Sequence, residues 1–143
     1  MLSELLAQLG YPAAVSEIPD RLRAIESFPA AGAFVATNRY AEVVGLVTAH
    51  LFPSIHDNGP VAWLTTLVVL EDARGLGIGS ALVQHVERWA VEKGAKRLSV
   101  TSGLQRVNTH EFYEKRDYER TGLRFSKHLR PEPVAESSHL TKA

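Results

Sequence analysis

The sequence predicts a mixed α+β protein, an α/β chain in the broad sense, with a mostly antiparallel sheet of about six strands flanked by helices. Three observations support this class. Strand-like segments follow one another directly between residues 33 and 70, as antiparallel neighbours do. A long amphipathic segment then leads into another short strand, as a crossover helix does. Two helical segments precede the first strand, so helices are available to cover the sheet.

Two short helices are expected first. Leucines at positions 2, 5, 6 and 9 form one helical face, and this helix is expected to end at Gly10. In the second helix, Ser16 is the predicted N-cap and Pro19 lies in the first turn. Its apolar stripe consists of Ile18, Leu22 and Ile25.

Strands are predicted at 33–37, 42–52 and 61–70, and a helix over about 77–94 that ends at Gly94. A strand at 97–101, a helix at 106–116 and a hairpin at 118–129, with its turn near Thr121-Gly122, complete the pattern. Residues 1–130 are therefore expected to form a single domain. Residues 131–143 contain Pro, Ser and Glu without periodicity and are expected to be a mobile tail.

Composition argues against several classes of function. Sixteen basic and 16 acidic residues give a formal net charge of zero, which disfavours a general binder of nucleic acid or of anionic membranes. The absence of cysteine excludes thiol nucleophiles, zinc–thiolate sites and disulfides. No His/Asp/Glu cluster has metal-ligand spacing, so no metal is expected. A cytoplasmic location is expected because no membrane-spanning stretch or secretory signal is visible.

The most informative segment is a glycine-rich loop between the apolar run 63–70 and the amphipathic helix. Its sequence is Arg74-Gly75-Leu76-Gly77-Ile78-Gly79-Ser80. Glycines remove side chains where a ligand must approach the backbone closely. The N–H groups at a helix N-terminus lack partners within the helix, and the helix dipole adds positive potential there. The segment is therefore predicted to bind a phosphate group.

Two common phosphate loops do not fit this segment. A P-loop needs Lys followed by Ser or Thr after its last glycine, whereas Gly79 is followed by Ser80-Ala81. A dinucleotide fingerprint needs G-x-G-x-x-G, but the sixth position is Ser80 or Leu82, depending on the starting glycine.

The pattern Arg-x-x-Gly-x-Gly resembles the acetyl-coenzyme A pyrophosphate loop of the GNAT superfamily of N-acetyltransferases, and the chain resembles a small bacterial member over about residues 2–129. Leu67-Val68-Val69 resembles that family's fourth strand. The resemblance implies acetyl-coenzyme A as cosubstrate. The residues it implies for binding are Leu67, Val68, Val69, Arg74, Gly75, Leu76, Gly77, Ile78, Gly79, Ser80 and Asn108.

A second motif, Phe112-Tyr113 followed by Tyr118, resembles a helix of the same family. The resemblance implies that Tyr113 is the general acid that protonates the leaving thiolate, and that the backbone N–H of Val69 stabilises the developing oxyanion. Two other interpretations stay open. Tyr113 could instead be an aromatic anchor of its helix, and Asn108 could instead be a surface residue of the first helical turn.

The chain departs from the family pattern in two places. Asp117 stands where glycine is usual, at a position that often needs positive φ, which Asp tolerates better than most residues. The strand that usually opens the family fold is lacking, which predicts an exposed edge at the strand over 33–38. We expect a second chain, as in a homodimer, or the C-terminal tail to cover this edge.

The leading hypothesis is an N-acetyltransferase in which a primary amine, of a small molecule or a protein, attacks acetyl-coenzyme A directly in a ternary complex. The alternative is a coenzyme A-binding module with little or no turnover, active in regulation or assembly. The general base stays open at this point. His50, His56, Asp57 and Glu17 are the candidates for the neighbourhood of the acceptor.

Overall fold

The computed structural model describes residues 1–130 and 142–143. The chain divides into two compact units, Met1–Leu104 and Gln105–Ala143, and each is described by itself. The single-domain interpretation of residues 1–130 stays a prediction. The expected mobile tail lies, except for its last two residues, outside the described residues.

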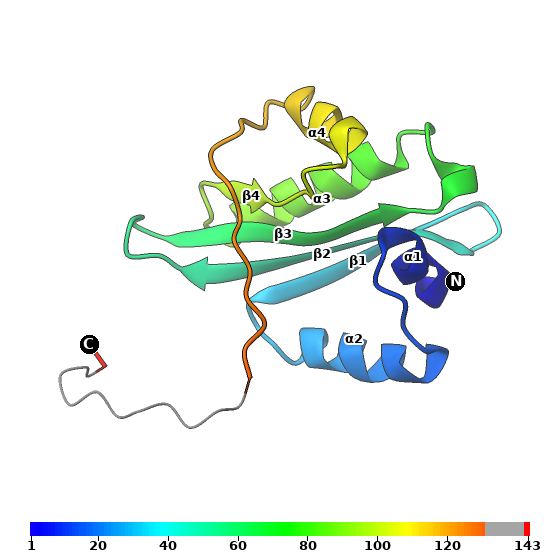
Figure 1. Ribbon diagram of the computed structural model, residues 1–143, viewed down its shortest axis with the longest axis horizontal. Coiled ribbons are helices and arrows are strands. Elements are labelled where there is room, and N and C mark those ends of the chain that lie inside the picture. The colour runs from blue at the N-terminus through cyan, green and yellow to red at the C-terminus, as the bar shows by residue number, and fades with distance from the viewer. Residues whose placement is uncertain (131–141) are drawn as a thin grey trace. The chain divides into compact units, whose positions relative to one another are not determined.

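The first unit contains a four-stranded sheet with strand order β1-β2-β3-β4 (Figure 1). β1–β2 and β2–β3 pair antiparallel and β3–β4 pair parallel, which confirms the mixed, mostly antiparallel class. The strands are β1 (Ala31–Thr37), β2 (Val43–Pro53), β3 (Pro60–Val69) and β4 (Leu98–Val100). The helices of this unit are α1 (Leu2–Leu9), α2 (Ile18–Glu26) and α3 (Ile78–Glu92).

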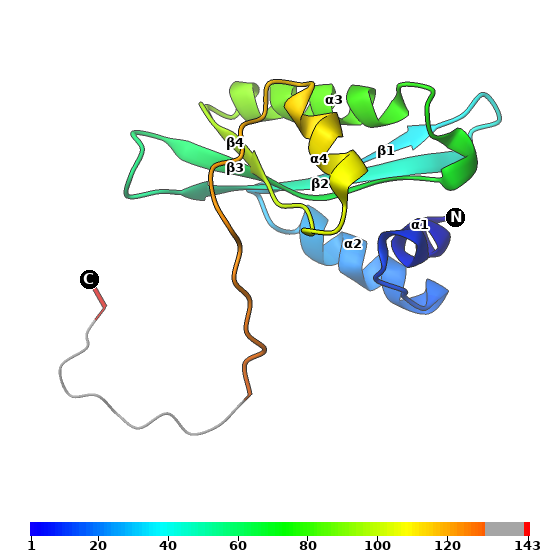
Figure 2. The ribbon, with the colours of Figure 1, turned by 45° about the horizontal axis from the view of Figure 1, so that its top comes forward.

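Helices cover both faces of this sheet, α3 on one face and α1 with α2 on the other (Figure 2). Beneath α1, fully buried Leu5 packs with Leu46 and Val68. A second cluster consists of Leu51, Ala62, Ala90 and Ala95, with Ala90 contributed by α3. Each large apolar side chain buried in this way stabilises the fold by roughly 1.5–3 kcal/mol.

Gly45 of β2 sets how closely α3 lies on the sheet. A Cβ atom at this position would lie 3.0 Å from Leu82 and 3.3 Å from Ile78, both on α3. The missing side chain therefore lets the first turn of α3 approach the middle of the sheet. This contact positions the N-terminus of α3 at the end of β3.

The parallel pairing between β3 and β4 is short. β4 pairs with Ala62–Leu64 of β3, so within the described residues the segment 65–69 has no strand on that side. β3 therefore presents an open edge in front of the loop that leads to α3.

Helix ends agree with the sequence at two glycines. Gly10 has φ of 98° and Gly94 has φ of 88°, the left-handed conformation expected of C-terminal glycines. The prediction of Ser16 as N-cap is wrong. A turn of 3₁₀ helix occupies Val15–Glu17, Glu17 is the residue before α2, and its carboxylate accepts from the N–H of Ala14 at 3.0 Å.

The second unit contains α4 (Val107–Glu114). Asp117 has φ of 65°, which confirms the expected left-handed conformation. The N–H of Tyr118 donates to the carbonyl of Tyr113 at 3.2 Å and closes the helix end around it.

The predicted hairpin at 118–129 is wrong, because residues 118–130 form no strand. Its alternating apolar residues, Leu123, Phe125 and Leu129, are 70%, 89% and 87% exposed, so they have no core to enter. Two strands without a packed face are marginally stable at best. The sheet of the described residues thus has four strands and not about six.

Candidate functional site

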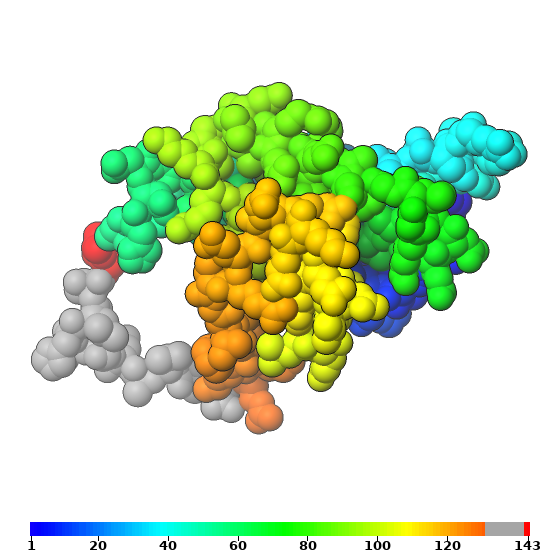
Figure 3. All heavy atoms as spheres, turned by 90° about the horizontal axis from the view of Figure 1, so that it is seen from above, coloured from blue at the N-terminus to red at the C-terminus, as the bar shows by residue number. Residues whose placement is uncertain are grey.

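The glycine loop joins the end of β3 to α3 through a 3₁₀ turn at Glu71–Ala73. Gly75 has φ of 77° and Gly77 has φ of 81°, a conformation that side chains with a Cβ adopt only at a cost. A Cβ at either position would meet no atom within 4 Å. The loop therefore needs glycine for its backbone shape, and it leaves open space next to that backbone. Its atoms project at the surface in green at the right of Figure 3.

The N-terminus of α3 is suited to an anion. The N-cap is Gly77, with no side-chain cap, and the first helical turn contains no acidic residue. The first intrahelical bond runs from the N–H of Ala81 to the carbonyl of Gly77 at 3.0 Å. Backbone N–H groups of the preceding residues point out of the helix, where the dipole favours negative charge. A diphosphate fits this arrangement.

Arg74 connects the loop to the sheet. Its Nε donates to the carbonyl oxygen of Val69 at 3.0 Å, and its Nη2 donates to Oε1 of Gln8 at 3.4 Å. A guanidinium has five N–H donors, so these contacts leave others for an anion at the loop. The side chain is exposed, which places this positive charge beside the glycines.

Gln8 of α1 is a contributor that the sequence did not reveal. Its Oε1 also accepts from the N–H of Glu71 at 3.0 Å, so one amide oxygen holds both ends of the 3₁₀ turn. Gln8 lies 63 residues from Glu71 along the chain. A lone glutamine on a leucine-rich helix carries no sequence signal for such a role.

Alternate residues of β3 direct their backbone N–H groups towards its open edge. The N–H of Leu70 donates to Val44 on β2 at 2.9 Å, so Val69 and Gly45 form a non-hydrogen-bonded pair. Alternation along the strand then directs the N–H groups of Leu67 and Val69 away from β2, towards the open edge. The N–H of Val68 faces β2, and its side chain is buried beneath α1.

The remaining predicted residues fall into two groups. Residues 74–80 form one continuous segment beside the end of β3, in which the side chain of Leu76 is 75% exposed. Asn108, which is exposed, and Tyr113 lie on α4 in the other unit. The structure therefore brings Leu67, Val69 and the loop together in one unit.

Tyr113 is buried, with 7% of its surface exposed. Within its own unit, its ring lies 5.2 Å from that of Phe112 and 5.5 Å from that of Tyr118, between centroids. Burial raises the pKa of Tyr113 to about 12, against a smaller opposing effect of Arg106 and Arg116. The hydroxyl is therefore protonated at neutral pH.

Two of the four candidates for a general base are already paired. The carboxylate of Glu17 accepts from Ala14 and lies 3.2 Å from Arg21, and Asp57 forms a 3.0 Å ion pair with Arg97. His56 lies exposed in the loop between β2 and β3. His50 is half-buried on β2, with its Nδ1 3.5 Å from the hydroxyl of Thr65.

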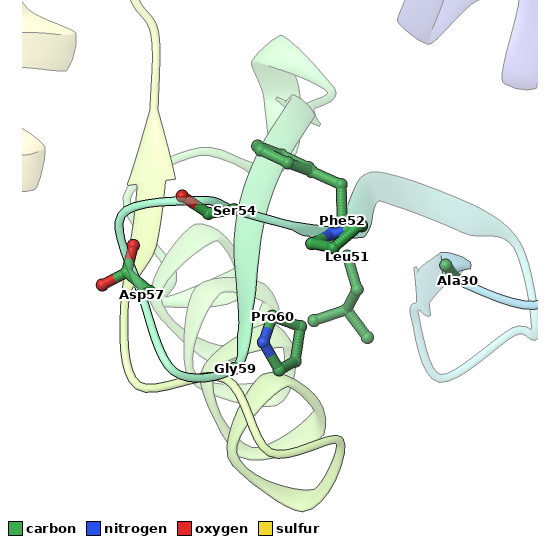
Figure 4. A pocket seen from close by; sticks show the side chains of 8 residues that line it. Ala30, Leu51, Phe52, Ser54, Asp57, Gly59 and Pro60 are labelled. Carbon is green, nitrogen blue, oxygen red and sulfur yellow. The ribbon is translucent and has the colours of Figure 1, made fainter. Parts of the chain in front are cut away.

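A shallow cavity of about 430 Å³ lies at the hairpin between β2 and β3 (Figure 4). Its lining includes Leu51, Phe52, Asp57 and Pro60. It stands at the opposite end of β3 from the glycine loop, which follows Val69. We assign the candidate site to the loop, because its two positive-φ glycines and the uncapped N-terminus of α3 present backbone donors that suit a phosphate.

Among the described residues, no group of three or more His, Cys, Asp or Glu side chains is placed to hold a metal ion. None of the helices in this part of the chain combines the length and apolarity that a membrane span needs.

Comparison with known proteins supports the resemblance to the GNAT family. An Aminoalkylphosphonate N-acetyltransferase of Salmonella typhimurium is 33% identical over 91 residues, covering 64% of this chain and 59% of the relative. The chain thus spans about three fifths of the length of that curated relative. A GNAT family acetyltransferase of Staphylococcus aureus shares the fold, with a TM-score of 0.77 and 20% identity over 90% of this chain and 87% of that one.

A structure described as a transcriptional regulator of Bacillus halodurans is also similar. It has a TM-score of 0.74 and 26% identity over 81% of this chain and 77% of that one. The sequence model of the Acetyltransferase (GNAT) family matches residues 2–118, which include the sheet, the glycine loop and α4. The chain therefore belongs to the GNAT acetyltransferase family.

Proposed function

We propose that this protein is an N-acetyltransferase that transfers the acetyl group of acetyl-coenzyme A to a primary amine. The observation that carries the proposal is the joint placement of an uncapped helix N-terminus and an open strand edge at the two ends of one short loop. Diphosphate binding and backbone alignment of a thioester need these two features side by side. Membership of the GNAT family supports the same chemistry.

We assign the diphosphate to residues 74–80. The backbone N–H groups at the start of α3 would donate to its oxygens, and the exposed guanidinium of Arg74 would add charge-assisted hydrogen bonds. The positive φ of Gly75 and Gly77 keeps this backbone accessible. Acetyl-coenzyme A supplies an acetyl thioester when bound.

The backbone N–H groups of Leu67 and Val69 are the proposed donors on β3. Both point towards the open edge, where they could align the cosubstrate and stabilise negative charge on the acetyl oxygen. The loss of one such donor in other enzymes typically slows the reaction by about 10²–10³-fold. Backbone donors cannot be removed by ordinary substitution, so their test lies in the side chains that hold the strand edge.

Tyr113 is the proposed general acid, on the grounds of its chemistry and its motif. A raised pKa of about 12 keeps the hydroxyl protonated at pH 7, as a proton donor requires. A thiol has an ordinary pKa of about 8.5, so complete proton transfer to a thiolate would be uphill by roughly 5 kcal/mol. We therefore infer that its main contribution is a hydrogen bond to the leaving sulfur while the carbon–sulfur bond breaks.

The acceptor is proposed only as a primary amine. The relative from Salmonella typhimurium is named for aminoalkylphosphonates, which makes such amines the first compounds to assay. Aminoglycosides and peptides with free amino groups represent the polycationic and protein acceptors. A direct attack in a ternary complex needs no covalent enzyme intermediate, and the chain has no cysteine that could form a thioester.

The experiment combines calorimetric titration with acetyl-coenzyme A and an assay of free thiol release over this amine panel. We expect saturable binding of acetyl-coenzyme A and amine-dependent thiol release with at least one member. Binding without release across the whole panel would favour the alternative, a coenzyme A-binding module. Absence of binding would contradict both functions.

A further inference from the structure

A cluster of three polar side chains lies where the register of β2 and β3 shifts. Thr48 pairs with Thr66 and Ala49 pairs with Leu64, so Thr65 is an extra residue on β3. Such a β-bulge re-aims the side chain of the extra residue. Thr48 is the buried polar residue of this part of the chain, 5% exposed. Its Oγ1 lies 2.8 Å from Oγ1 of Thr65.

The single hydroxyl proton of Thr65 decides the protonation of its neighbours. Thr65 Oγ1 donates to the backbone carbonyl of Thr48 at 3.2 Å, and a carbonyl can only accept. Oγ1 of Thr65 also lies 2.8 Å from Oγ1 of Thr48 and 3.5 Å from Nδ1 of His50. In the arrangement in which Thr65 donates to the carbonyl, its Oγ1 accepts from these two atoms, and neutral His50 then carries its proton on Nδ1 and keeps a lone pair on Nε2.

The cluster lies close to the open edge of β3. Thr65 is the first residue of β3 beyond the short pairing with β4, and it is exposed. Leu67, whose N–H points to that edge, is two residues further, or about 7 Å along the strand. Val69 is four residues further, about 13 Å. A carbonyl held at Leu67, and not one held at Val69, would leave room for a proton to pass from the attacking amine to the histidine through water.

We propose that His50 is the general base of the transfer, with Nε2 as the atom that accepts the amine proton, and that Thr65 is a positioning residue that fixes the Nδ1–H tautomer. This inference rests on the proposed function. In the step, the amine nitrogen forms a bond to the acetyl carbon, and the proton on that nitrogen passes to Nε2 of His50. The carbon–sulfur bond breaks, and the sulfur leaves as a thiolate that accepts a hydrogen bond from the hydroxyl of Tyr113. Solvent then takes the proton from His50 and protonates the thiolate.

The side chains that face His50 carry no charge. Its cross-strand partners are Ala31 and Trp63, and Phe28 is its ring neighbour at 6.5 Å between centroids. None of these side chains is ionisable. The charged residues of α2, the helix over this face, are Asp20, Arg21, Arg23 and Glu26. Asp20 pairs with Arg23, Arg21 pairs with Glu17, and Glu26 is exposed.

The first test is independent of turnover. Long-range proton–nitrogen NMR of the ¹⁵N-histidine-labelled protein reports the tautomer, and His50→Gln assigns the signal by its loss. We expect the Nδ1–H tautomer for neutral His50 in the unmodified protein and in Thr65→Ser, and a shift towards Nε2–H in Thr65→Val. An Nε2–H tautomer in the unmodified protein would overturn the proposal.

The second test measures rates with the amine that the panel identifies. His50→Gln is expected to lower kcat about 100-fold and to abolish the fall of the rate at acidic pH, with the KM for acetyl-coenzyme A unchanged. His56→Gln, the matched loop variant, should behave like the unmodified protein. Thr65→Val should lower kcat about 10-fold, and Thr65→Ser should restore it.

The outcomes separate the two proposals. Turnover by the unmodified protein together with an unchanged pH profile in His50→Gln would overturn the role of His50 and leave the acetyltransferase function intact. Absence of turnover with every amine would contradict the proposed function, and the role of His50 would fail with it.

Discussion

Nε of Arg74 donates to the carbonyl oxygen of Val69 at 3.0 Å, so the first residue of the glycine loop is tied to the last residue of β3. The contact fixes how the loop leaves the strand. It also holds the guanidinium beside the N-terminus of α3, where an anion would sit. One side chain thus connects the strand edge to the proposed diphosphate site.

We predict that Arg74→Gln weakens acetyl-coenzyme A binding about 10-fold, or about 1.4 kcal/mol, because a charge-assisted contact is lost. The affinity of Arg74→Lys for acetyl-coenzyme A should lie between those of the unmodified protein and Arg74→Gln, since lysine keeps the charge but lacks the planar guanidinium. Calorimetric titration measures both, and the weakening should shrink as salt screens the charge. Arg39→Gln, in the exposed β1–β2 turn, is the control. Equal affinities for the Arg74 and Arg39 variants would remove Arg74 from the site.

A second prediction concerns the backbone of the loop. Gly77→Ala should destabilise the fold by about 1–2 kcal/mol, because φ of 81° is costly for a residue with a Cβ. It should also weaken acetyl-coenzyme A binding, since relaxation of the strain moves the first N–H groups of α3. Gly94→Ala provides a matched control at the other end of the same helix, with φ of 88° and equally open space. It should lower the melting temperature similarly and leave the affinity unchanged.

The parts of the fold that follow from local sequence were predictable. Alternation and β-branched residues located all four strands, and glycines with positive φ marked the ends of α1 and α3. The left-handed Asp117 was also predictable, because few other residues tolerate that conformation. The hairpin at 118–129 failed for a physical reason. Alternating apolar residues form a strand only where a neighbouring strand pairs with their backbone and a core buries their side chains. Phe125 remains 89% exposed.

The same distinction applies to the candidate site: the contiguous segment was predictable from the sequence, and the contacts between distant segments were not. The glycine loop is contiguous in sequence, so its shape could be predicted. Gln8 reaches Glu71 across 63 residues, and Thr65 reaches Thr48 across a register shift. Neither contact is encoded by local spacing. For the same reason the sequence could not choose among His50, His56, Asp57 and Glu17, whereas the ion pair of Asp57 with Arg97 distinguishes them in the structure.

A third prediction follows from the raised pKa of Tyr113, about 12 against an ordinary value of 10. Above pH 10 the unfolded chain releases this proton and the folded protein keeps it, so stability falls as pH rises. Below pH 10 the contribution is fully present. Between pH 10 and 12 the free energy of unfolding should drop by up to about 3 kcal/mol more in the unmodified protein than in Tyr113→Phe. Urea titrations of both proteins across this range measure the difference. Parallel curves would show that the hydroxyl titrates normally.

The same Tyr113→Phe variant makes a separate prediction for catalysis. Loss of the hydroxyl should lower kcat about 10- to 100-fold and leave the affinity for acetyl-coenzyme A within about twofold, because a hydrogen bond to the leaving sulfur acts in the transition state. Stopped assays of thiol release give kcat, and calorimetric titration gives the affinity for acetyl-coenzyme A. An unchanged kcat would leave Tyr113 with the structural role of an aromatic anchor beside Phe112 and Tyr118.

A last prediction tests the packing that positions the start of α3. Gly45→Ala introduces a Cβ that would lie 3.0 Å from Cδ1 of Leu82 and 3.3 Å from Cγ2 of Ile78, so these side chains, or the helix that carries them, must move by a few tenths of an ångström. Overpacking of this kind costs about 1–3 kcal/mol. Because Ile78 is the first residue of α3, we expect a lower melting temperature together with weaker acetyl-coenzyme A binding. Gly59→Ala is the matched control, since its Cβ would meet only the carbonyl of Gly94 at an ordinary 3.6 Å. If Gly45→Ala lost stability but bound acetyl-coenzyme A as tightly as Gly59→Ala does, the position of the helix N-terminus would not govern the affinity.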